Sequence, residues 1–206
     1  MKNPETTHAE TRREEIIAAC EKLYETMNFK DITIKEIAAY TSFSRPSIYN
    51  YFETKEEIFL AIFEKEYRAW NADLADLREK HDSLSIDDFA REIAETLERR
   101  PLLLRLLSMN MYDMEENSRM ERLTEFKAEY GKSFGEVRLC LEKFFPCMGE
   151  EKRAMFVRLF FPFMFGLYPY AVITPKQREA IAKAGAPLEE TTVAELAEKF
   201  VKELLG

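Results

Sequence analysis

Residues 42–58 read SFSRPSIYNYFETKEEI, and the local pattern of these residues indicates how the N-terminal part of the chain folds. Ser44 can cap a helix that must end before Thr54. Pro46 is tolerated in that helix, because an amide in the first turn has no intrahelical partner to lose. Thr54 and Glu57 then form the T-x-x-E pattern that marks another helix start. The stretch therefore predicts a very short helix, a sharp stop and a second, longer helix.

The same start pattern appears twice upstream, at Thr11 with Glu14 and at Thr33 with Glu36. The first pair is expected to open a helix with one apolar face, made of Ile16, Ile17, Cys20, Leu23, Tyr24 and Met27. The second pair opens a short helix. Residues 33–52 thus form a helix, a turn and another helix, which is the size and order of a helix-turn-helix.

The composition favours helices throughout the chain. Its 206 residues are 46% hydrophobic and 33% charged, with only six glycines and eight prolines to make turns. Few turn residues favour long helices over many short strands, so an all-α fold is expected. Further helices are expected in the second half of the chain, over residues 85–99, 101–117, 119–145, 150–173 and 189–204.

Cysteine and histidine usage argues against metal, disulfide and enzyme chemistry. The three cysteines, Cys20, Cys140 and Cys147, are odd in number and form no CxxC pair, so no disulfide framework, metal site or cofactor is expected. No HExxH, G-x-S-x-G, P-loop or dinucleotide pattern occurs, and His8 and His81 fall in an expected tail and linker. The N-terminus lacks the apolar segment of a signal peptide, so a cytoplasmic protein is expected.

One segment needs a membrane test. Residues 159–173, LFFPFMFGLYPYAVI, are all apolar or small, but they fall short of the roughly 20 residues that a spanning helix needs. Pro162, Gly166 and Pro169 interrupt the segment, and Arg158 precedes it. No membrane partner is expected, and the segment is predicted to be a helix that is buried or faces another subunit.

Residues 32–63, ITIKEIAAYTSFSRPSIYNYFETKEEIFLAIF, resemble the DNA-binding domain of the tetracycline-repressor (TetR) family of bacterial transcription regulators. The likeness covers roughly residues 10–65, while the remainder is similar only in being helical. Two departures stand out. Pro46 replaces a small residue or glycine that is usual in the family, and Ser42-Phe43 replaces a common Gly-Val.

The resemblance implies a DNA-binding transcriptional regulator, a ligand-responsive repressor that binds a palindromic operator as a homodimer. The expected fold is an all-α chain with an N-terminal three-helix helix-turn-helix DNA-binding domain and a larger C-terminal helical ligand-binding and dimerisation domain. The predicted boundaries are 1–53 for the helix-turn-helix domain, 54–78 for a connecting helix and 79–206 for the C-terminal domain.

A recognition helix presents the side chains of its N-terminal end to base edges in the major groove of double-stranded DNA. Arg45 is the leading base-reading candidate, because its guanidinium can bond to O6 and N7 of one guanine together. Ser47 and Asn50 follow, and Pro46 lies beside them although it removes an amide that a phosphate could have met. The family resemblance adds the expected phosphate contacts, which are Thr33, Ser44, Tyr49, Tyr51 and Lys55.

A structural interpretation stands beside each of these residues. Phe43, Ile48 and Phe52 are expected to be core of the small domain. Arg45 and Lys55, taken alone, are ordinary solvated charges, and their positions at two helix starts favour the functional interpretation. Residues 1–60 carry eight basic and eleven acidic side chains, a net charge of −3, so DNA affinity must come from cations focused on one face. The candidate cations are Arg45, Lys55, Lys30, Lys35, Arg12 and Arg13.

One short recognition helix reads too few base pairs for genomic specificity, so two copies are expected. The candidate dimer interface lies on the apolar run and the last amphipathic helix: Phe156, Phe160, Phe163, Leu167, Leu196 and Phe200. The alternative is that the same run is internal core.

The C-terminal domain is expected to sense a small apolar or amphipathic effector. The candidate pocket residues are adaptable or aromatic groups with one polar member: Leu106, Met109, Asn110, Met114, Phe126, Phe134, Phe160, Met164 and Tyr168. Plain core is the alternative for these positions. The alternative function for the whole chain is a helical small-molecule-binding or protein-interaction module without DNA binding.

Overall fold

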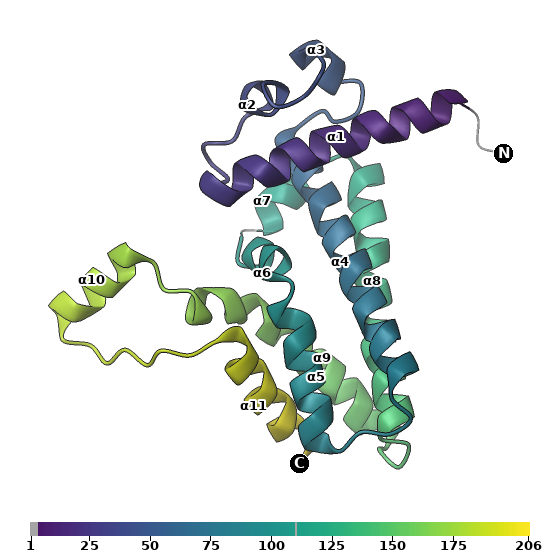
Figure 1. The fold of residues 1–206 in the computed structure, drawn as a ribbon, viewed down its shortest axis with the longest axis vertical. Coiled ribbons are helices and arrows are strands. Elements are labelled where there is room, and N and C mark those ends of the chain that lie inside the picture. The colour runs from purple at the N-terminus through teal and green to yellow at the C-terminus, as the bar shows by residue number, and fades with distance from the viewer. Residues whose placement is uncertain (1–3, 110) are drawn as a thin grey trace. The chain divides into compact units, whose positions relative to one another are not determined.

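The computed structural model describes residues 4–109 and 111–206, and every regular element in these ranges is an α-helix (Figure 1). The predicted all-α class is therefore confirmed. The helices form two compact units. The first unit comprises Met1–Lys65 and Asn110–Ala128, and the second comprises Glu66–Met109 and Glu129–Gly206. Two long helices, α4 (Lys55–Lys80) and α8 (Met120–Phe144), contribute to both units.

The first unit is a small helical core around a helix-turn-helix. Besides the starts of α4 and α8, its helices are α1 (Pro4–Thr26), α2 (Ile34–Ala38), α3 (Arg45–Ile48) and α7 (Met111–Glu116). Its fully buried apolar residues include several from the segment between the start of α1 and the middle of α4, and Met114 of α7: Ile16, Cys20, Ile32, Ile37, Ile48, Phe52, Phe59, Phe63 and Met114. The short helices α2, α3 and α7 would not be stable alone in water, so packing on this shared core holds them in place.

The predicted helix starts hold in two places and fail in one. Thr33 Oγ1 accepts a hydrogen bond from the Glu36 amide (3.4 Å), and Thr54 Oγ1 accepts one from the Glu57 amide (3.2 Å). The prediction that α1 begins at Thr11 is wrong, because α1 already begins at Pro4. Proline suits that position, since a first-turn residue needs no amide and its φ is helical.

The second unit combines the remainders of α4 and α8 with α5 (Ile86–Glu98), α6 (Pro101–Leu107), α9 (Glu150–Ala171), α10 (Pro175–Ala184) and α11 (Val193–Leu205). Helix α11 packs on α5 and α9, and α6 packs on α9.

The core of the second unit is aromatic, with Trp70 at its centre. The Trp70 ring lies 6.3 Å from the ring of Phe160 and 6.0 Å from that of Phe161. Phe134 stacks on Phe161 at 3.9 Å. The one polar atom of the indole is satisfied, because Trp70 Nε1 donates to Thr96 Oγ1 (3.0 Å). Buried indole nitrogens usually find such a partner, so Trp70 is held in the core by both packing and a hydrogen bond.

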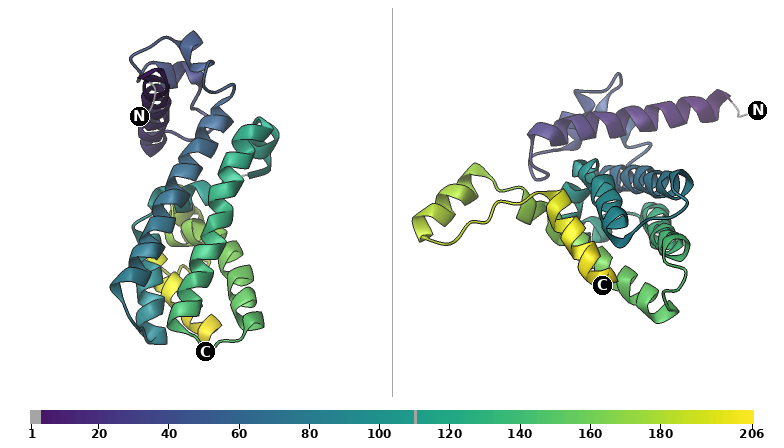
Figure 2. Two further views of the ribbon diagram at one scale, coloured as in Figure 1. Left: turned by 90° about the vertical axis from the view of Figure 1, so that its right-hand side faces the viewer. Right: turned by 60° about the horizontal axis from the view of Figure 1, so that its bottom comes forward.

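Two helices differ from the sequence prediction. The expected helix over residues 101–117 is broken, because α6 ends at Leu107 and the Ser108 side chain caps it by donating to the Arg105 carbonyl (2.6 Å). Helix α10 was not predicted, although Thr174 and Gln177 form a T-x-x-Q capping pattern at its start. Figures 1 and 2 show α10 projecting away from α5, α11 and most of α9.

Helix α9 is unusually apolar. Among the described residues it is the one helix long and hydrophobic enough to cross a membrane by length and composition, and 28% of its most apolar stretch is buried inside the protein. It begins with the charged residues Glu150 and Glu151 and contains Pro162 and Pro169. A core helix of a water-soluble protein passes the same test.

Candidate nucleic-acid interface

Buried side chains and hydrogen bonds hold the turn before α3 in place. Ile48 and Phe52 are completely buried beneath α3. The Thr41 hydroxyl donates to the Ala38 carbonyl (3.0 Å), which closes the end of α2. The Glu15 carboxylate of α1 accepts bonds from both the amide and the hydroxyl of Ser42. These contacts set the direction in which α3 leaves the turn.

The outer face of α3 is open to solvent. Ser44, Arg45, Pro46, Tyr49 and Asn50 are all exposed, as a base-reading surface requires. Arg45 Nη2 donates to the Tyr49 hydroxyl (3.1 Å), and the guanidinium lies 5.8 Å from the centre of the Tyr49 ring. This contact restricts the arginine before any ligand arrives, which lowers the entropy cost of binding.

The remaining predicted DNA contacts are less exposed, apart from Thr33. Thr33 is exposed at the start of α2, while Ser47 and Tyr51 are half-buried. Ser44 stands at the start of α3, but its hydroxyl meets that of Ser47 (3.2 Å) and makes no cap bond to the backbone. Lys55 has a structural task that the sequence did not reveal. Its ammonium donates to two carbonyls that follow α1, at 2.7 Å and 3.0 Å, and lies 4.2 Å from the Phe29 ring.

Two arginines of α1 flank the helix-turn-helix. The Arg12 guanidinium lies 5.9 Å from the ring of Phe43 in the turn. Arg13 lies 5.5 Å from the ring of Phe52 and is paired with Glu64 at 3.5 Å. Arg12 is exposed and adds positive charge beside the turn, whereas the charge of Arg13 is already partly neutralised.

An ion pair between Glu57 and Arg119 connects the start of α4 to the residues that follow α3. Glu57 is completely buried, yet its carboxylate is fully bonded. It accepts the Glu53 amide (2.8 Å), the Arg119 amide (3.0 Å), and the Nε (2.6 Å) and Nη2 (2.8 Å) of the same arginine. Arg119 Nη2 also reaches the Tyr51 carbonyl (3.3 Å). A bidentate arginine with additional amide bonds is the geometry in which a buried carboxylate is tolerated.

The same junction carries a second tie. The Thr54 hydroxyl donates to the Asn117 carbonyl (2.9 Å). Residues 117–119, between α7 and α8, therefore form hydrogen bonds both to the segment that follows α3 and to the start of α4. Nothing in the sequence pattern predicted this contact, because Thr54 and Asn117 lie 63 positions apart.

The pKa of Glu57 gives a testable pH dependence. Burial raises this pKa, but the bonds from Arg119 and from the Glu53 amide outweigh burial and hold it below the ordinary value of 4.5. The carboxylate therefore stabilises the fold fully above the unfolded-state pKa, and this contribution is lost as the pH falls through the folded-state pKa. The pKa of a glutamate in an unfolded chain is about 4.3. We therefore expect the difference in unfolding free energy between wild type and Glu57→Gln to be constant from pH 6 to 8 and to shrink as the pH falls below that pKa. A difference that persists unchanged in acid would contradict this assignment.

The predicted pocket residues are divided between the two units. Met114 and Phe126 are buried in the first unit, and Leu106, Phe160 and Met164 are buried in the second. The half-buried members are Met109, Phe134 and Tyr168, and Asn110 lies outside the described residues.

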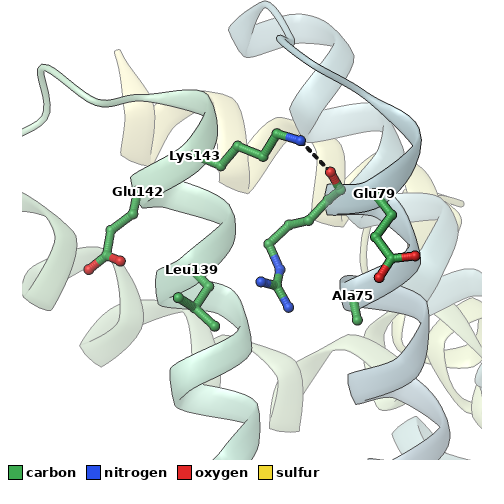
Figure 3. Close-up of a pocket in the computed structure, with 6 residues that line it drawn as sticks. Ala75, Glu79, Leu139, Glu142 and Lys143 are labelled. Atoms are coloured by element: carbon green, nitrogen blue, oxygen red, sulfur yellow. Dashed lines mark hydrogen bonds between the residues drawn. The ribbon is translucent and has the colours of Figure 1, made fainter.

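Other residues line two concavities on the surface of the part of the chain that the structure describes. One is a groove of about 490 Å³ between α4 and α8, where Lys143 donates to the Arg78 carbonyl (Figure 3). Its wall mixes both charge signs, because Glu79 and Glu142 line it together with Arg78 and Lys143, so it is not an apolar pocket. The other, of about 400 Å³, lies between the end of α9 and α10. No group of three or more possible metal ligands occurs among the described residues.

The predicted interface residues divide by exposure. Phe156, Phe160 and Leu167 are buried within their own unit. Phe163 of α9 and Phe200 of α11 are half-buried and stack on each other at 3.8 Å, and Leu196 is also half-buried. The exposed apolar residues of α9 are instead Met155, Leu159 and Tyr170, at 51%, 44% and 74% exposure. Because phenylalanines occur on nearly every face of α9, periodicity could not tell its inner face from its outer one.

Comparisons with known proteins agree with this architecture. The model for bacterial regulatory proteins of the tetR family matches residues 16–62, and the model for the tetracycline repressor-like C-terminal domain matches residues 64–205. Among curated proteins, none matches the sequence.

Several solved structures share the whole fold. The fatty acid degradation regulator FadR from Bacillus halodurans is 12% identical with a TM-score of 0.61, and the alignment covers 100% of this chain and 97% of that one. A regulator of the TetR/AcrR family from Thermobifida fusca is 16% identical with a TM-score of 0.60, at 95% and 97% coverage. The repressor AlkX from Dietzia sp., implicated in biodegradation of n-alkanes, is 12% identical with a TM-score of 0.52, at 94% and 95% coverage.

Proposed function

We propose, from the premise that this chain belongs to the tetracycline-repressor family, that it is a ligand-responsive repressor which binds a palindromic operator as a homodimer. Membership makes it a transcriptional regulator with an N-terminal DNA-binding domain, and not an enzyme. Regulators of this family bind DNA operators and dimerise. They are soluble DNA-binding proteins, and we place this one in the cytoplasm.

The exposed outer face of α3 is the observation that carries the proposal. Arg45, Ser47 and Asn50 reach base edges, with Arg45 at the first position of α3 and Asn50 two residues after its last position, Ile48. Ser44, Pro46, Tyr49, Tyr51 and Thr33 surround this face and meet phosphates or sugars. Lys55 is proposed to contact a phosphate. Two of its three N–H donors are bonded to backbone carbonyls, which fix the position of its positive charge.

Two copies pair through α9 and α11. This pairing is supported by the exposed apolar surface of α9. Removing apolar surface from water is favourable by about 25 cal/mol per Å². Met155 and Leu159 are the most exposed aliphatic side chains of this surface, and the stacked Phe163 and Phe200 border it together with Leu196. The buried residues Phe156, Phe160 and Leu167 support this face from inside.

The function is tested by DNA binding and its salt dependence. We expect the full-length protein to bind a palindrome in the DNA upstream of its own gene, measured by fluorescence anisotropy. The logarithm of the affinity should fall with the logarithm of the salt concentration, with a slope of about −0.9 per phosphate neutralised. A folded dimer that binds no nearby palindrome would favour the module without DNA binding, and affinity independent of salt would contradict the phosphate contacts.

The effector we propose is small and apolar or amphipathic, bound in the second unit near Leu106, Met109, Phe160, Met164 and Tyr168. The single tryptophan, Trp70, is buried against Phe160 and reports on this region. Saturated fatty acids are suitable probes, because one structural neighbour is a fatty acid degradation regulator.

We expect a bound fatty acid to change Trp70 emission saturably and to weaken operator binding by about 5- to 150-fold. Because such coupling is reciprocal, operator DNA must weaken binding of the fatty acid by the same factor. A saturable change in emission without any change in operator affinity would contradict an effector role for this region.

A further inference from the structure

Helix α10 is specified carefully by the sequence, yet it has almost nothing to pack against. Thr174 Oγ1 accepts the Gln177 amide (3.2 Å), and the Gln177 side chain accepts the Thr174 amide (2.9 Å), which completes a capping box. Gly185 ends the helix with a φ of 63°, which favours glycine. None of the residues of α10 is buried. Isolated helices shorter than about 12 residues are marginal in water, so caps alone do not account for this one.

The segment over residues 172–192 forms an arm with one apolar side. Its concavity of about 400 Å³ is lined mainly by Tyr170, Ile173, Ile181, Pro187 and Leu188. Glu189 also lines this concavity, while four other charged residues of the arm pair with one another. Arg178 binds Glu190 across the arm, and Lys183 binds Glu179 along α10 (2.6 Å). The arm therefore offers a preformed surface that is mainly apolar, with Glu189 as the charged member of its lining.

This surface continues the exposed apolar face of α9. Tyr170 belongs both to the wall of the concavity and to α9, and it is 74% exposed. Leu159 and Met155 lie farther back along the same helix at 44% and 51% exposure. Stable dimers bury about 800 Å² on each partner, which a single helix face supplies with difficulty. A two-fold axis brings the same surfaces of both copies together, so an arm at the end of α9 meets the partner.

We infer that residues 172–192 are an exchanged arm, whose concavity packs on the apolar surface of a second copy of this chain. The inference rests on the proposed homodimer and adds a second contact region to it. In this arrangement the arm of each copy is held by the other copy, which supplies the packing that α10 lacks within its own chain.

Dimerisation of the full-length protein tests the arm. The variant Ile181→Glu places a charge in the concavity of both arms, and we expect it to weaken the dimer by about tenfold or more in analytical ultracentrifugation. Ala182→Glu is the matched control, since Ala182 is the next residue on the same helix and does not line the concavity. An Ile181→Glu dimer as tight as wild type would overturn the inference.

Hydrogen exchange provides a measurement that does not depend on how the variant folds. We expect the amides of α10 to exchange slowly in the wild-type dimer and at least about tenfold faster in a monomer made by Leu159→Arg. Equal exchange of α10 in dimer and monomer would overturn the arm while leaving the dimer in place. A wild-type protein that is monomeric at all concentrations would instead contradict the proposed function itself.

Discussion

Replacing Arg45 with alanine is expected to weaken operator binding by at least about 30-fold. A bidentate contact between arginine and guanine contributes about 1–3 kcal/mol of discrimination, and a homodimer makes two such contacts. Arg45 is exposed at the start of α3 and is already oriented by the Tyr49 hydroxyl at 3.1 Å, so its loss removes a prearranged contact. Fluorescence anisotropy with operator and with scrambled DNA measures both the affinity and the specificity.

Two comparisons separate base reading from general charge. Arg99→Ala removes an equally exposed arginine from the second unit, and we expect it to leave operator affinity unchanged. The melting temperature of Arg45→Ala should match that of wild type, because exposed side chains contribute little to stability. If Arg45→Ala weakened binding to operator and scrambled DNA equally, the residue would be a phosphate contact. No loss on either DNA would show that α3 does not enter the groove.

Replacing Arg119 with methionine is expected to lower the free energy of unfolding by about 3 kcal/mol, as measured by urea denaturation. The change leaves the fully buried carboxylate of Glu57 without its bidentate partner, and breaking such a pair costs about 3–5 kcal/mol. The low end of the range applies because the Arg119 side chain is 36% exposed and water screens part of its charge.

Two further variants show whether the loss comes from the buried charge. Arg138→Met breaks an exposed pair with Glu142 and Glu150, and we expect a change of no more than about 0.5 kcal/mol. The double variant Arg119→Met with Glu57→Gln should recover part of the stability, since a neutral amide is less costly to bury than a carboxylate. If the double variant were as unstable as the sum of the single changes, the ion pair would not be the cause.

The helix-turn-helix could be predicted because its determinants are local. Thr33 and Thr54 cap helices within three residues of their partners, and Pro46 fits the first turn that its neighbours define. The exposed face of α3 follows from the burial of Ile48 and Phe52 on the opposite side. Each of these features can be found within a window of a few residues, which is the range in which sequence patterns are informative.

The remaining features depend on contacts between distant residues. Glu57 looked like half of a capping box, but its carboxylate turned to Arg119, 62 residues away. The sequence alone leaves Lys55 as a solvated cation, whereas in the structure its ammonium donates to two carbonyls in the loop after α1. On α9 the pattern was apolar on every side, so only the structure shows which phenylalanines face inward. The arm was missed for a local reason, because the Thr174 cap was not recognised.

In vitro selection of DNA from a random pool by the full-length protein tests the central claim most directly. We expect palindromic sites whose half-sites are separated by about 10 base pairs or a multiple of that distance, with a guanine in each half-site whose enrichment disappears for Arg45→Ala. Selected sites without two-fold symmetry, or sites that Arg45→Ala selects just as well, would contradict the claim that paired copies of α3 read this DNA.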